Sequence, residues 1–167
     1  MTGTQTIRML ARYNAWANKT LFNAVFELPA GEAVKTRPTL FSSMVNTLNH
    51  LYVVDLIWQA HLQGREHGIA ALSTVLHAEL EQLWQAQQAI DVWYIAWSNA
   101  LSEAEVDQIV QFTLIGGNLG AMRRGDIMLH VVNHTSYHSG FVADLFYQVP
   151  ARQPLTDLPV FLRENSA

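Results

Sequence analysis

The chain has 167 residues and a formal net charge of −4, and only 14% of its residues are charged, against about 25% in ordinary domains. Basic residues adjoin only at Arg123-Arg124, so we expect no nucleic-acid partner, because phosphate binding needs clustered Lys and Arg. No apolar run approaches the roughly 18 residues of a membrane span, and the N-terminus lacks a secretory signal pattern. With zero cysteines a disulfide framework is excluded, and a cytoplasmic location is expected.

Hydrophobic residues make up 50% of the chain. A small domain so poor in charge is expected to keep some apolar surface, which favours a two-fold homodimer. The alternative is one large, well-filled core that contains the five tryptophans.

Apolar side chains recur at steps of three and four residues in the first half of the chain, which predicts amphipathic helices. The first helix is expected over residues 4–28, before Pro29-Ala30-Gly31, and its apolar stripe contains the polar Asn14. The second is expected after Pro38, up to Gln63. Apolar residues surround most of its girth, which predicts a central position in the fold.

A third helix is expected to begin at Ser73, as its N-cap, and to reach Asn99. Residues 106–124 follow, with β-branched and aromatic residues in alternation and the turn-forming Gly116-Gly117-Asn118. This stretch predicts a small hairpin or an irregular crossover.

The last long helix is expected from Asp126, as its N-cap, to Gln148, and residues 154–163 are expected to form a short helical turn. The elements together predict an all-α fold, a four-helix bundle with a long non-nearest connection before its last helix. Because the chain shows no repeat or linker, a single domain over residues 1–167 is expected.

Three histidines stand at helical spacing in the last helix: His130, His134 and His138. Residues four apart on a helix differ by about 40° around the axis and about 6 Å along it, so neighbouring pairs can share a ligand. The apolar stripe places His134 and His138 inward, between Val131 and Phe141, and His130 to the side. We therefore predict that His134 and His138 bind a metal ion and that His130 is a neighbouring group.

A metal site in a helical bundle is usually completed from a facing helix. His50, in the predicted central helix, is the candidate, although Asn49 and Asp55 could also face the pair. Three neutral nitrogens would leave positions open for water or substrate, as in catalytic sites, and would suit Zn²⁺, Ni²⁺ or another divalent ion. A structural network of histidines is the alternative that spacing alone leaves open.

Four other polar residues allow both a functional and a structural interpretation. Asn14 and Asn18 could contact substrate, but hydrogen bonds to a neighbouring helix or the crossover are favoured. Asp55 could instead be a buried carboxylate that bonds the hairpin backbone. Tyr137 could act as an acid or hydrogen-bond donor, and an interface tyrosine is favoured. The remaining histidines, at positions 61, 67 and 77, are expected to face solvent.

The chain resembles the DinB-like family in four motifs that keep their order along nearly the whole sequence. These are Tyr13-Asn-Ala-Trp-Ala-Asn18, Asn49-His50-Leu51, His130-Val-Val-Asn-His134-Thr-Ser-Tyr-His138-Ser-Gly140 and Pro154-Leu-Thr-Asp157-Leu. The resemblance implies an up-down-down-up four-helix bundle, often dimeric, that holds a divalent metal through three histidines.

Matched to the family's motifs, those ligands are His50, His134 and His138, whereas His130 matches a recurrent position not counted as a ligand. Ser139 departs from the arginine that relatives often carry there, which puts in doubt a contact of that arginine with a substrate anion.

The resemblance implies a small-molecule substrate and a metal-dependent enzyme, foremost a transferase that uses a low-molecular-weight thiol such as mycothiol, bacillithiol or glutathione. Metal-water hydrolysis is a second enzymatic expectation. A non-catalytic metal- or ligand-binding protein is the alternative from another class, and an open cleft above the metal would favour an enzyme.

Overall fold

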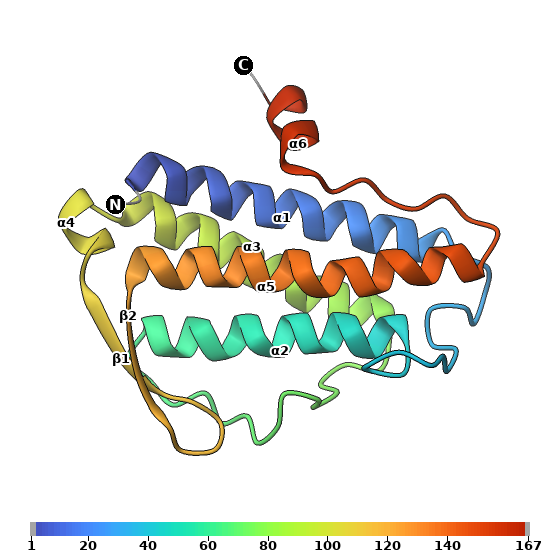
Figure 1. The fold of residues 1–167 in the computed structure, drawn as a ribbon, viewed down its shortest axis with the longest axis horizontal. Coiled ribbons are helices and arrows are strands. Elements are labelled where there is room, and N and C mark those ends of the chain that lie inside the picture. The colour runs from blue at the N-terminus through green and yellow to red at the C-terminus, as the bar shows by residue number, and fades with distance from the viewer. Residues whose placement is uncertain (1–2, 166–167) are drawn as a thin grey trace.

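The computed structural model describes residues 3–165, in which four long helices form a bundle. They are α1 (Thr4–Phe26), α2 (Met44–Leu62), α3 (Leu80–Ala100) and α5 (Arg124–Leu145). In Figure 1, α1 and α5 run from left to right, and α2 and α3 run in the opposite direction. Both α1 and α2 pack against α3 and α5, so the links from α1 to α2 and from α3 to α5 cross the bundle diagonally. The predicted all-α bundle is confirmed.

Five smaller elements complete the described chain: α4 (Glu103–Val106), β1 (Ile109–Thr113), β2 (Leu119–Arg123), the 3-10 helix η1 (Phe146–Gln148) and α6 (Leu158–Glu164). Within residues 3–165, no helix has both the length and the apolar character needed to cross a membrane. The single-domain organisation of residues 1–167 stays a prediction, and its outermost residues, 1–2 and 166–167, lie outside the described range.

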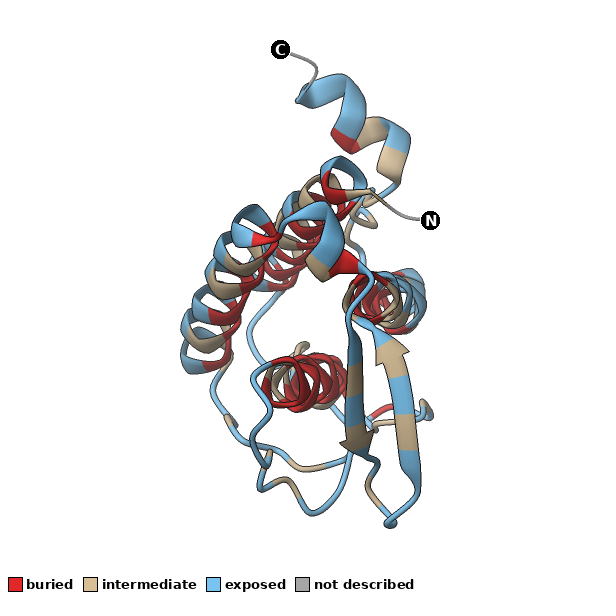
Figure 2. Cartoon of the chain, turned by 90° about the vertical axis from the view of Figure 1, so that its left-hand side faces the viewer, coloured by how far each residue is buried: buried red, intermediate tan, exposed pale blue. Residues whose placement is uncertain are grey.

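The second helix is buried around most of its girth, as its sequence predicted. Figure 2 shows buried residues on nearly all sides of α2. Ser43 caps its first turn by accepting a 3.1 Å hydrogen bond from the backbone N–H of Asn46. The helix ends before Gly64, whose φ of 66° suits glycine. Because α2 is enclosed by helices, loop and hairpin, a polar side chain on any of its faces needs a specific partner.

The expected hairpin is present between α4 and α5. β1 and β2 pair antiparallel, with Phe112 opposite Gly120. A Cβ atom at Gly120 would lie 2.4 Å from the ring of Phe112, so only glycine lets this ring lie across the partner strand. From there the ring packs against Trp58 and His61 of α2, with ring centroids 4.9 and 5.1 Å away.

Three predicted helix starts were wrong. α2 begins at Met44 rather than directly after Pro38. α3 begins at Leu80 rather than after Ser73. The intervening loop is held by Asn49, whose Oδ1 accepts hydrogen bonds from the backbone N–H groups of Leu76 and His77. α5 follows β2 directly, so Asp126 lies in its first turn and is not its N-cap.

A buried polar layer joins α1, α2 and α3. Gln87 Nε2 donates to Asp55 Oδ2 at 2.9 Å and to Asp91 Oδ1 at 3.2 Å. Asn18 Nδ2 donates to the same Asp91 oxygen at 2.9 Å, and the Tyr94 hydroxyl donates to the Asp55 carbonyl at 2.8 Å. Asp55 therefore faces α3, and the expectations that it faces the histidines or bonds the hairpin were wrong. For Asn18, the favoured bond to a neighbouring helix is confirmed.

Burial sets the protonation of these carboxyl groups. It raises the pKa of Asp91 to about 7, against the hydrogen bonds from Asn18 and Gln87 that lower it. It also raises the pKa of Asp55 well above its usual range, with a further contribution from the nearby Asp91 charge. The folded protein therefore holds protons here that the unfolded chain releases above about pH 4.

The Asp91 carboxyl is consequently expected to contribute less to the free energy of unfolding of the apoprotein as pH rises from about 4 through 7, by up to roughly 4 kcal/mol. The buried His134 and His138, whose pKa values burial lowers, act in the opposite direction over the same range. The free energy of unfolding of Asp91→Asn should therefore increase relative to that of wild type as pH rises, whereas the exposed control Asp144→Asn should follow wild type. Urea unfolding at a series of pH values measures this, and equal slopes for Asp91→Asn and wild type would contradict it.

Candidate metal centre

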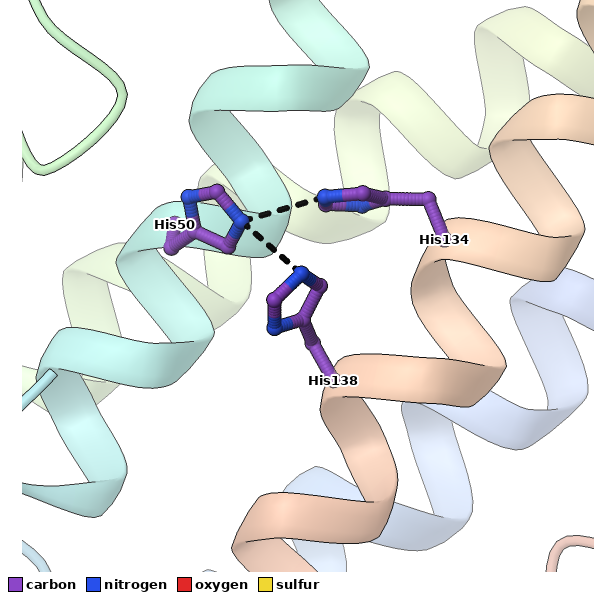
Figure 3. Close-up of side chains that lie close together, drawn as sticks. All are labelled: His50, His134 and His138. Atoms are coloured by element: carbon purple, nitrogen blue, oxygen red, sulfur yellow. Dashed lines mark hydrogen bonds between the residues drawn. The ribbon is translucent and has the colours of Figure 1, made fainter. Parts of the chain in front are cut away.

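Three imidazoles converge between α2 and α5 (Figure 3). The Nε2 atom of His50 lies 3.0 Å from that of His134 and 3.3 Å from that of His138. The three side chains offer ligand atoms that all lie within 4.8 Å of one another, a group that could hold a metal ion. His50 and His138 are buried, and His134 is half-buried.

The antiparallel packing of α2 and α5 creates this arrangement. His134 and His138 are one turn apart on α5, so their rings project on the same side with a centroid distance of 4.4 Å. His50 reaches them from the facing helix. The sequence-predicted group is therefore brought together, with two rings from one helix and one from the other.

A backbone carbonyl fixes the tautomer of His50. Its Nδ1 atom lies 2.9 Å from the Leu72 carbonyl oxygen, which can only accept, so Nδ1 carries the proton and Nε2 keeps its lone pair free. The ring of Phe41 stacks on the His50 ring at 4.2 Å and 20°. Both contacts orient the His50 lone pair toward α5.

Burial also keeps the three imidazoles neutral. It lowers the pKa of His134 to about 3, with further contributions from His138, His50 and His130. It lowers the pKa of His138 to about 4, helped by His50, and lowers that of His50 against the opposing bond to Leu72. Neutral imidazole is the form that binds metals.

A divalent ion fits this donor set better than hydrogen bonding does. Tetrahedral coordination with nitrogen at about 2.0–2.1 Å separates ligand atoms by about 3.3 Å, close to the two observed separations. Without an ion, the single lone pair of His50 Nε2 accepts one strong hydrogen bond, so one of its two close nitrogen contacts stays unsatisfied.

An open cleft of about 550 Å³ lies over the three nitrogens. Besides the histidines it is lined by Leu40, Phe41, Ala70, Ala71, Leu72, Ser73 and Ile115. An open cleft is the feature expected of an enzyme rather than of a closed structural site. Its walls are mostly apolar, which suits a substrate with an apolar body.

The other histidine of the motif stands aside, as predicted. The His130 ring packs edge-on against Trp58 at 4.8 Å and lies 5.9 Å from His134. Tyr137 is 65% exposed and contacts the edge of the His138 ring.

Two polar residues behaved otherwise than the sequence indicated. The Nδ2 atom of Asn14 is buried without a partner in the described chain, so its favoured hydrogen bond is not seen. His61, expected in solvent, is only 7% exposed, because the hairpin covers the end of α2. Its position at a helix end suggested exposure, and only the packed hairpin reveals the burial.

The protein is thus an all-α bundle in which three imidazoles from two antiparallel helices form a group that could hold a metal ion. Residues 1–166 match the sequence profile of the DinB family, and the chain belongs to that family. It is also similar to Protein DinB of Bacillus subtilis (strain 168). The two are 26% identical over 159 residues, which cover 92% of this chain and 91% of that protein.

The metal content of purified protein is expected to depend on the converging rings. His134→Ala and His138→Ala should each lose most of any bound divalent metal, since two imidazoles hold an ion weakly. His130→Ala, on the same helix, is the matched control and should keep it. Elemental analysis measures the metal content, and full retention of metal in both variants would contradict the assignment of His134 and His138 as ligands.

Proposed function

We propose that the protein is a divalent-metal-dependent enzyme, and specifically an S-transferase that uses a low-molecular-weight thiol. The observation that carries the proposal is the convergence of three neutral imidazole nitrogens beneath an open cleft. Membership of the DinB family supports the metal-dependent part. The thiol part rests on the likeness of the sequence motifs to thiol-dependent relatives.

His50, His134 and His138 would hold the ion, with Zn²⁺ or Ni²⁺ as the best-suited metals. When bound there, a divalent ion would favour the thiolate form of the co-substrate thiol, which is the stronger nucleophile. The Leu72 carbonyl orients the His50 ring, and Phe41 packs on its face. The walls of the cleft around the histidines are mostly apolar.

The lining of the cleft favours thiol transfer over hydrolysis. Among the described residues, it contains no Asp, Glu, Lys or Arg. Hydrolysis would typically call for a general acid or base that moves protons at the scissile bond, whereas a divalent ion would itself favour the deprotonated form of a thiol. Asp55, a carboxylate on the same helix as His50, is buried against α3 instead.

The activity is tested with zinc-loaded protein, an electrophile such as 1-chloro-2,4-dinitrobenzene, and several thiols. Turnover should require thiol, stop on chelation and fall at least about 100-fold in His134→Ala, because metal catalysis contributes several kcal/mol. His130→Ala should keep it. Thiol-independent ester cleavage would point to a hydrolase, and absence of any metal-dependent turnover would leave a non-catalytic binding protein.

The protein is further proposed to act on a small molecule as a homodimer. The low charge content leaves large apolar side chains on the surface, such as Val92 at 65% exposure on α3 and Tyr147 at 80% on η1. Exposed apolar residues of this size favour self-association. Sedimentation at micromolar concentration should give twice the chain mass of 18.8 kDa, and a monomer there would contradict the dimer.

The cytoplasmic location stays a prediction.

A further inference from the structure

A second hollow, of about 580 Å³, lies at the C-terminal end of α2. We call it the α2-end pocket. It is formed by residues 64–70, which follow α2, and by residues 111–116 of the hairpin, with His61 at its base. Figure 1 shows the loop after α2 and the hairpin tip side by side below that helix. The pocket shares Ala70 and Ile115 with the cleft over the histidines, so the two hollows adjoin.

The α2-end pocket lies in line with the metal centre along α2. His50 and His61 are eleven residues apart, which places them within about 20° of each other around the helix and about 16 Å apart along it. Rings connect the two sites: His130 lies 4.8 Å from Trp58, and Trp58 lies 5.3 Å from His61. One elongated ligand could therefore lie along this face and reach both hollows.

His61 gives the pocket an unsatisfied hydrogen-bonding group. Only 7% of the residue is exposed, and its Nε2 atom has no partner among the described residues. A buried polar atom without a partner destabilises the free protein. The ring is held between Phe112, stacked at 5.1 Å, and the edge of His67 at 5.5 Å. Burial, and then the neighbouring His67, lower its pKa, so the ring is neutral. Because its Nε2 atom is covered in this structure, a ligand in the pocket reaches it by displacing the neighbouring His67 ring.

Arg65 supplies positive charge to the same pocket. Its guanidinium is held by the side-chain oxygens of Gln63 and Gln59, at 2.6 and 3.2 Å, and by the Glu66 carbonyl. All three acceptors are neutral, and Arg65 has no ion pair within residues 3–165. The Glu66 carboxylate is exposed and does not pair with it. A positioned guanidinium without a counter-ion favours a carboxylate ligand.

We propose that the α2-end pocket binds the carboxylate end of the thiol co-substrate, with Arg65 and His61 as its contacts. This rests on the proposed S-transferase function. The two hollows adjoin at Ala70 and Ile115, so a thiol that reaches both must carry its carboxylate several bonds away from its sulfur. The co-substrate is therefore a thiol larger than 2-mercaptoethanol that carries a carboxylate.

The test is binding of glutathione, a tripeptide thiol, to the zinc-loaded protein by isothermal titration calorimetry. Arg65→Gln should raise its Kd about tenfold, as expected for loss of one charge-assisted hydrogen bond. His61→Phe, which keeps a ring against Phe112, should also raise it. Binding of 2-mercaptoethanol, which has no carboxylate, should change in neither variant. Arg12→Gln, an exposed arginine on α1, is the matched control.

S-Methylglutathione separates this proposal from the proposed function, because its blocked sulfur cannot form a thiolate. If thiols do not bind the metal, glutathione and its S-methyl form bind equally and no turnover occurs, yet both stay dependent on Arg65 and the pocket proposal holds. If Arg65→Gln and His61→Phe keep the glutathione Kd within twofold of wild type, or if wild type binds neither tripeptide, the proposal is overturned. Metal content and circular dichroism of each variant verify loading and folding.

Discussion

The antiparallel contact of α2 with α5 is the constraint on which the site depends. It sets His50 of one helix against His134 and His138 of the other, with Nε2 separations of 3.0 and 3.3 Å. Because consecutive long helices lie diagonally in this bundle, except for α2 and α3, the contact joins segments far apart in the chain. Sliding α2 by one turn, about 5.4 Å, would separate the imidazoles beyond the reach of one ion.

The buried polar layer is the feature that opposes such sliding. Gln87 of α3 donates to Asp55 of α2 and to Asp91 on its own helix. Asn18 of α1 donates to the same Asp91 carboxylate. A shift along any of these helices would leave buried polar groups without partners, which costs about 1–3 kcal/mol each. We infer that the layer fixes the position of α2 along α3, and with it the position of His50.

The long helices were predictable, because apolar residues recur every three or four positions along the buried face of a helix. The stripe on α5 identified His134 and His138, and the apolar girth of α2 predicted its central place. The start of α3 was missed, because Ser73 is a suitable N-cap and the hydrogen bonds from the loop to Asn49 are invisible in the sequence. His61 was placed in solvent, since nothing local shows that the hairpin folds over it. Asp55 could not be assigned, because its partner Gln87 lies on a different helix.

The sequence by itself therefore determined the helices, the hairpin and the residue types at the site, because these depend on local periodicity, turn residues and side-chain chemistry. Only the tertiary structure decided which third histidine meets the pair, that the Leu72 carbonyl fixes its tautomer, and that the cleft adjoins a second pocket beside Arg65. These features arise where α2, the loop after it and the hairpin pack together. Contacts between such distant segments are set by the packing of the whole bundle. The spacing of residues along the sequence does not show them.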